Sequence, residues 1–195
     1  NKTKIYDDKN QPFISLDDIL LKGKHNLSNL IAAATVAKLL KVDNQTIRKT
    51  MENYSGIEHR LQIIRELNGV TYINDSKATN IQSVIVAVNS FDNSVILILG
   101  GKNKNSDFRL LLPHTKRHVK HIVSYGEAGG EIATAIGDAV RLNRVRSLSQ
   151  AVASAHKLAT PGDIILMSPG CASFDQFDNF EERGNKFANL VKKLK

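Results

Sequence analysis

From Val70 to the C-terminus, short runs of apolar and β-branched residues alternate with segments of helical spacing. The apolar runs are "VTYIN" at 70–74, "SVILILG" at 94–100, "HIVSYG" at 121–126, "VRLNRVR" at 140–146 and "DIILMSP" at 163–169. Apolar residues recur every three or four positions in "IQSVIVAVNSF" at 81–91, "EIATAIGDA" at 131–139, "LSQAVASAHKLA" at 148–159 and the final amphipathic segment at 179–195. Strands that alternate with helices predict an α/β fold, a mostly parallel sheet with helices on both faces.

The first ~55 residues follow a different pattern. The alanine-rich segment 25–42 predicts one helix, and 43–55 predicts a second helix with Asp43 as its N-cap. Residues 3–23 predict strand fragments and turns. Because these pieces are not expected to form a core alone, we expect the chain to begin inside a larger domain, with a boundary near Gly56 that separates residues 1–55 from residues 56–195.

Composition restricts the class of protein. The chain has 195 residues, 42% of them hydrophobic, so it can bury a sizeable core. Its apolar runs are far shorter than the ~20 residues that cross a bilayer, and the N-terminus lacks a signal-peptide layout, so a cytoplasmic protein without membrane contact is expected. One cysteine, Cys171, agrees with a reducing compartment.

A net charge of +8 allows either a nucleic-acid partner or an anionic small molecule. The basic stretch "HTKRHVKH" at 114–121 has no interleaved aromatic residues, so we expect a solvated surface there, as at the terminal "KKLK". His114, His118 and His121 lack a metal-binding spacing and are expected at the surface. The sequence predicts no metal site.

Four polar or glycine-bearing loops follow predicted strands: "NDSKATN" at 74–80, "GGKNKNSDF" at 100–108, "YGEAGG" at 125–130 and "SPGCASFDQF" at 168–177. In a parallel sheet, the carboxyl ends of the strands share one edge, where helix N-termini attract anions. The four loops therefore predict a ligand site on that edge, whereas "TPGD" at 160–163 is an ordinary turn on the opposite edge.

Taken singly, these motifs have simpler explanations. Asp75 or Ser76 could cap a helix, and the loop lysines 77, 102 and 104 could be solvated. Neither "GGKNKNS" nor "GEAGG" matches a nucleotide-binding fingerprint. Cys171 has no histidine at a spacing that implies a base, so a packed side chain is favoured over a nucleophile, and Ser173 lacks a nucleophile elbow.

Taken together, the same loops supply two ammonium groups, several hydroxyls and one carboxylate. These are Lys77 and Lys104, then Ser76, Thr79 and Ser173, and finally Asp75. This mixture suits a ligand with two or more carboxylates or phosphates. Since the sequence offers no general acid–base pair, any catalysis would rest on positioning and electrostatic stabilisation. Asn74 and Asn80 are expected to hold the first loop in shape.

Longer motifs carry a family resemblance. "GKHNLSN", "GIEHRL", "INDSKATN", "LGGKNKNSDF" and "SPGCASFDQFDNFEERGNKF" occur in the order and approximate spacing of the Mur ligases, from Gly23 to the C-terminus. "DSKATN" with the long C-terminal motif resembles the D-glutamate-adding members. "KNKNS" is less rich in glycine than is usual in these enzymes.

The resemblance implies the last part of a central ATPase domain, followed by a complete Rossmann-like C-terminal domain that binds the amino acid. The implied reaction is ATP-dependent: the carboxylate of UDP-N-acetylmuramoyl-L-alanine is phosphorylated, and the amine of D-glutamate attacks the acyl phosphate during peptidoglycan synthesis. The UDP-sugar domain, the P-loop and the main Mg²⁺ ligands would lie outside this chain, which is therefore expected to be inactive alone. A monomer is expected.

The resemblance also implies site residues. Asn26 and Asn29 would contact adenine, Arg60 the ATP phosphates and Asp75 the ribose, in a cleft between the two domains. The D-glutamate carboxylates would be held by Thr79, Lys104, Ser173 and the backbone at Phe180, with Lys77 supporting them. No catalytic residue is assigned. The alternatives are a non-catalytic Rossmann-like module that binds an acidic small molecule and, ranked well below it, a nucleic-acid binder.

Overall fold

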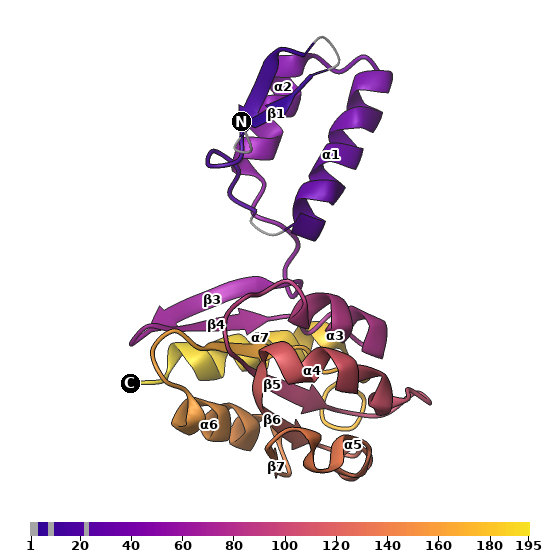
Figure 1. Cartoon of the computed structure of the whole chain (residues 1–195), viewed down its shortest axis with the longest axis vertical. Helices are drawn as coiled ribbons and strands as arrows, with labels where there is room; N and C mark the ends of the chain where they lie inside the picture. Colours follow the sequence, from indigo (N-terminus) through magenta and orange to yellow (C-terminus); the bar gives the residue numbers. More distant parts are fainter. Residues whose placement is uncertain (1–3, 8–9, 22–23) are drawn as a thin grey trace. The chain divides into compact units, whose positions relative to one another are not determined.

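The computed structural model describes residues 4–7, 10–21 and 24–195 and forms two compact units, Asn1–Gly56 and Ile57–Lys195 (Figure 1). Residues 3, 8, 9, 22 and 23, part of the segment where strand fragments and turns are expected, lie outside the described residues. Each unit has its own apolar core.

The first unit contains the two predicted helices, and its predicted strand fragments form a short antiparallel pair. Its elements are β1 (Lys4–Tyr6), β2 (Pro12–Ser15), α1 (Lys24–Leu39) and α2 (Asn44–Asn53). Asp43 caps α2, since its carboxylate accepts the N–H of Thr46 at 2.9 Å. The expectation that these pieces form no core is wrong, because apolar side chains from β2, α1 and α2 are buried together. They include Ile14, Leu30, Ile47 and Met51.

The second unit is built on a six-stranded sheet. Its strands are β3 (Gln62–Leu67), β4 (Val70–Asn74), β5 (Val95–Gly100), β6 (Val119–Tyr125), β7 (Leu142–Arg144) and β8 (Ile164–Met167), in the order β3-β4-β8-β5-β6-β7. All neighbouring pairs are parallel except β3 with β4. The predicted α/β fold is confirmed, and β8, the last strand in sequence, lies between β4 and β5.

Two helical layers cover the sheet (Figure 1). The helices are α3 (Ile81–Val88), α4 (Leu112–His118), α5 (Gly129–Ile136), α6 (Leu148–Leu158) and α7 (Phe180–Lys192), with short 3₁₀ turns η1 (Phe108–Leu111) and η2 (Gly137–Ala139). Alternate residues of each strand point to opposite faces. On β5, Leu97 packs with α3, η1 and α5, whereas Ile96 packs with α6 and α7. Both faces of the sheet are therefore buried under helices, which explains why its strands are nearly continuous apolar runs.

The antiparallel edge strand β3 is absent from the sequence-based prediction. It pairs with β4 through a two-residue turn in which Asn68 and Gly69 both have positive φ, 53° and 75°. Asn-Gly is the preferred pair for such a hairpin turn, so the signal was present in "LNGV". The apolar run at 70–74 is therefore β4, and β3 precedes it in the sequence.

The basic stretch 114–121 also differs from expectation. It spans the end of α4 and the start of β6. His121 is only 9% exposed because it points into the face of the sheet that packs on α6, so the prediction of a surface position is wrong for it. His114 is half-buried and lies 3.0 Å from the Asn89 side chain, between Nδ1 and Nδ2.

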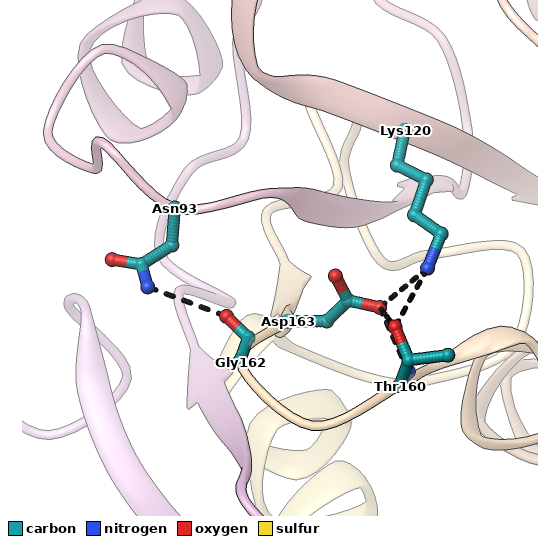
Figure 2. A network of polar contacts seen from close by, with 5 residues as sticks. All are labelled: Asn93, Lys120, Thr160, Gly162 and Asp163. Carbon is teal, nitrogen blue, oxygen red and sulfur yellow. Dashed lines mark hydrogen bonds and ion pairs between the residues drawn. The ribbon is translucent and has the colours of Figure 1, made fainter.

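The opposite edge of the sheet carries structural turns, as expected for "TPGD". Figure 2 shows the buried Asp163 carboxylate accepting hydrogen bonds from the Lys120 ammonium at 2.7 Å and from the Thr160 hydroxyl at 2.9 Å. The amide of Asn93 donates to the Gly162 carbonyl at 3.3 Å. These bonds fasten the α6–β8 turn to the starts of β5 and β6.

Candidate functional site

The loops at the carboxyl ends of β4, β8 and β5 are joined by backbone hydrogen bonds. Because β8 lies between the other two strands, its loop is in the middle. Gly170 N–H donates to the Ala78 carbonyl at 2.9 Å on one side. On the other side Lys102 and Ala172 exchange two bonds of 2.9 and 3.0 Å. The loops that carry the predicted ligand groups therefore form one continuous edge.

The loop after β4 leads into α3 through an asparagine cap. The Asn80 side chain accepts the N–H of Ser83 at 2.9 Å. Asn80 therefore holds the loop in shape, as predicted, and the alternative in which Asp75 or Ser76 caps the helix is wrong.

Asp75 is buried, 5% exposed, and fastens three chain segments. Its carboxylate accepts the Ser168 hydroxyl at 2.7 Å and the Leu61 N–H at 3.2 Å. Burial raises the pKa of Asp75 to about 6, although these hydrogen bonds and the charge of Arg60 oppose the rise. A ribose hydroxyl would have to bond to the lone pairs that Ser168 and Leu61 leave.

Arg60 is exposed between two residues with left-handed backbone. His59 has a φ of 63° and Leu61 a φ of 45°. A bulky residue with positive φ is a strained exception that surrounding contacts must hold. Here the His59 carbonyl accepts the Lys77 N–H at 3.0 Å, and the Leu61 N–H is bound by Asp75. The strained turn thus lies beside the β4 loop and directs Arg60 to solvent.

The two predicted ligand lysines are exposed, and each ammonium lies over an aromatic ring. Lys77 Nζ is 5.0 Å from the ring centroid of Phe180, and Lys104 Nζ is 5.4 Å from that of Phe174. These distances fall within the range of cation–π attraction. Both rings belong to the segment after β8.

Lys104 lies in a turn that asparagines stabilise. The Asn103 side chain accepts the Ser106 N–H at 2.9 Å and donates to the Glu131 carboxylate at 2.6 Å. Asn105 adopts a φ of 60°, a conformation that asparagine tolerates better than most residues. The loop therefore forms its turn without the glycines that are usual in the resembling enzymes.

The remaining predicted D-glutamate groups lie on the same edge. Ser173 is 3% exposed and follows the Lys102–Ala172 bridge by one residue. Thr79 is half-buried and follows the Ala78 carbonyl that Gly170 binds. The structure places both hydroxyls on adjacent loops, one on each side of the β4–β8 boundary.

Sequence reasoning missed Arg183, which is 0% exposed. Its Nε and Nη2 donate to the hydroxyl and carbonyl of Ser76 at 3.0 and 2.8 Å, and its Nη1 donates to the Cys171 carbonyl at 3.0 Å. The guanidinium thereby ties the loop after β4 to the loop after β8. The available signal was its position on the apolar face of α7, three residues after Phe180 and four before Phe187.

Cys171 has the packed position that the sequence favours. Its side chain is 0% exposed within the core under α3 and α5. Burial raises the pKa of the Cys171 thiol to about 12, although the nearby Arg183 charge opposes the rise. The thiol is therefore protonated at neutral pH and unsuited to nucleophilic attack.

Two predicted adenine contacts belong to the first unit. Asn26 is buried and Asn29 is exposed, both in the first turns of α1. Within residues 4–7, 10–21 and 24–195, no group of three or more His, Cys, Asp or Glu side chains is placed to hold a metal ion. No helix of the described residues has the length and apolar character to span a membrane.

Comparison with known proteins places the chain in a family. The family model described as "Mur ligase, glutamate ligase domain" matches residues 59–171. The UDP-N-acetylmuramoylalanine–D-glutamate ligase of Salinibacter ruber is 38% identical over 189 residues, which are 96% of this chain and 41% of the relative. The enzyme of that name from Natranaerobius thermophilus is 44% identical over 193 residues, 97% of this chain and 41% of the relative.

Solved structures show the same fold at low sequence identity. The UDP-N-acetylmuramate-alanine ligase of Thermotoga maritima matches with a TM-score of 0.66 at 14% identity, over 91% of this chain and 40% of that one. MurF from Acinetobacter baumannii matches with a TM-score of 0.66 at 18% identity, over 88% and 39%. The chain thus spans about two fifths of the length of the relatives it matches. From its sequence and its fold, the chain belongs to the Mur ligase family.

Proposed function

We propose that this chain is part of an ATP-dependent ligase that adds D-glutamate to UDP-N-acetylmuramoyl-L-alanine through an acyl phosphate, in cytoplasmic peptidoglycan synthesis. Relatives at 38–44% identity that bear the corresponding name support this activity. Since the chain spans 41% of their length, the activity is proposed for the complete enzyme, and the chain alone is expected to be inactive. We further propose that the enzyme acts as a monomer and binds neither nucleic acid nor membrane.

The observation that carries the proposal is the set of cationic and hydroxyl groups on the joined loops after β4, β5 and β8. Lys77, Thr79, Lys104, Ser173 and the backbone at Phe180 would hold the two carboxylates of D-glutamate. A dicarboxylate needs two anion sites, and ammonium groups with nearby hydroxyls provide charge-assisted hydrogen bonds. The exposure of both lysine side chains supports this role, because their ammonium groups can reach a ligand.

The chemistry would rest on positioning. The amine of D-glutamate must attack the acyl phosphate of the other substrate, and fixing both carboxylates of the amino acid restricts where that amine lies. Among the described residues on this edge, Asp75 is buried and bonded to Ser168 and Leu61, and the Cys171 thiol is protonated. The proposal therefore assigns no catalytic acid, base or nucleophile to this chain.

The nucleotide would be ATP, with Arg60 at its phosphates, Asp75 at the ribose, and Asn26 and Asn29 at the adenine. Two structures of similar fold were solved with ADP, the MurF ligase of Thermotoga maritima and the folylpolyglutamate synthase of Mycobacterium tuberculosis. Mg²⁺ would accompany ATP in the complete enzyme. The described residues do not fit a metal site of their own, so no step is assigned to the ion here.

Replacing Lys104 by alanine in the complete enzyme tests the D-glutamate site. Loss of one charge-assisted hydrogen bond should raise the KM for D-glutamate by about 10- to 150-fold and leave the KM for ATP unchanged. Phosphate release measured against D-glutamate, L-glutamate and ATP gives both constants. Lys116→Ala, an exposed lysine on α4, is the matched control. An unchanged D-glutamate dependence in Lys104→Ala would reject the assignment.

A further inference from the structure

Phe174 is an exposed aromatic residue in a buried stretch of the loop after β8. Its side chain is 62% exposed, whereas Ala172 and Ser173 before it are each 3% exposed. Single exposed hydrophobic residues are common and need no special role. Phe174 differs because the Lys104 ammonium lies over its ring, 5.4 Å from the centroid. The ring therefore faces one of the two proposed ligand cations.

The other proposed ligand lysine provides an internal comparison. The Lys77 ammonium lies 5.0 Å from the ring centroid of Phe180. Phe180 is held by two neighbours, because its ring packs edge-on against His59 with centroids 6.3 Å apart and its carbonyl accepts the Ser76 hydroxyl at 2.7 Å. Each lysine thus has its own ring, and both rings come from the seven residues that follow Ser173.

The backbone around Lys104 is fixed by Asn103 and by the Lys102–Ala172 bridge, but its side chain has four rotatable bonds. A free lysine side chain loses rotamer entropy when it binds a ligand. A ring that attracts the ammonium before binding reduces this loss, since the side chain already occupies fewer rotamers. The segment that supplies the ring also supplies Ser173.

We infer that Phe174 is a positioning residue for the acidic amino acid: its ring face holds the Lys104 ammonium beside Ser173, so that both groups can bind one carboxylate of the ligand. The inference rests on the proposed function for the identity of the ligand. The arrangement of ring and ammonium does not depend on that function and can be measured without any ligand.

Nuclear magnetic resonance of the chain tests the arrangement directly. A methylene group above a ring face is shielded, so the ε-methylene protons of Lys104 should resonate upfield of those of Lys116. Phe174→Leu removes the ring and should abolish this displacement, whereas Phe174→Tyr keeps a ring face and should retain it. Identical Lys104 shifts in the wild type and in Phe174→Leu would overturn the inference, whatever the ligand.

Kinetics of the complete enzyme test the consequence for binding. Phe174→Leu should raise the KM for D-glutamate by about two- to five-fold, the factor expected from an exposed cation–π contact, with kcat and the KM for ATP unchanged. Phe174→Tyr should keep the wild-type KM. Phe91→Leu, a half-buried phenylalanine that packs on the core before β5, is the matched control.

The possible results separate the two proposals. A wild-type enzyme without D-glutamate-dependent activity contradicts the proposed function, and the resonance measurement then still decides whether the ring positions Lys104. An active enzyme whose KM for D-glutamate is the same in the wild type and Phe174→Leu contradicts the inference alone. An equal increase of the KM for D-glutamate in Phe174→Leu and Phe174→Tyr would also overturn the inference, because the ring face would then be irrelevant.

Discussion

Replacing Arg183 by lysine should destabilise the Ile57–Lys195 unit while keeping the buried charge. The guanidinium reaches three acceptors, the hydroxyl and carbonyl of Ser76 and the carbonyl of Cys171, at 2.8–3.0 Å. A planar guanidinium can donate hydrogen bonds to acceptors on two separate loops, whereas a lysine ammonium is a single charged group at the end of a flexible side chain. We therefore expect the lysine variant to keep one of these hydrogen bonds and to leave two acceptors unpaired.

The magnitude follows from the two lost bonds. Hydrogen bonds to charged groups contribute ~1.5–3 kcal/mol each, so the gross loss is ~3–6 kcal/mol. Local relaxation of the loops recovers part of this energy, and we expect the free energy of unfolding to fall by ~3 kcal/mol. For a unit of this size, such a change lowers the melting temperature by ~6–12 °C.

Calorimetry of the wild-type and variant chains measures the effect. Arg109→Lys is the matched control, because Arg109 is 73% exposed and pairs with an exposed Asp107. Exposed ion pairs contribute ~0–1 kcal/mol, so this control should melt close to the wild type. If Arg183→Lys melted as the control does, the guanidinium would not hold the two loops together, and its place at the centre of the site would lose its physical basis.

Two buried carboxylates predict opposite pH dependences. Burial raises the pKa of Asp75 from 3.8 to about 6, so the folded state favours the protonated carboxyl. The free energy of unfolding therefore falls as the pH rises from about 4 to about 6, by ~3 kcal/mol at most. Asp75→Asn should remove this slope in denaturant titrations at pH 4–7. Burial alone would raise the pKa of Asp163, but its hydrogen bonds from Lys120 and Thr160 hold it below its usual value. Its stabilisation is therefore complete above pH ~4 and lost at lower pH, so Asp163→Asn should be less stable by ~1–3 kcal/mol at pH 7 and approach the wild type in acid. Thermal melts across pH 2–7 would contradict this if the difference stayed constant.

Most of the second unit could be predicted because its signals are local. The apolar run at 164–167 and the turn chemistry at 160–163 define β8 and its start without reference to distant residues. The missed strand β3 also had a local signal, the Asn68–Gly69 turn. The surface position predicted for His121 was wrong because basic stretches are usually solvated. In β6, however, side chains alternate between the two faces of the sheet, and His121 lies at a buried position.

The candidate site was predicted as a set of loops but not as an arrangement. The positions of Lys77, Lys104 and Ser173 after strands follow from the pattern, and their shared edge follows from parallel strands. The contacts of Arg183 do not follow, because its acceptor Ser76 lies 107 residues away in the sequence. The sequence places Arg183 on the apolar face of α7, directly after two glutamates, but it does not identify the loops to which the guanidinium donates.

By itself, the sequence determined the alternation of strands and helices, the edge on which the polar loops lie, and the family resemblance. These properties depend on residue periods and motifs that are read within a few positions. Only the tertiary structure decided that β8 inserts between β4 and β5, that a buried arginine ties the loops after β4 and β8, and that each proposed ligand lysine lies over a ring. Strand order and buried polar contacts are set by packing between segments far apart in the chain, where a residue's own neighbours carry no information about its partner.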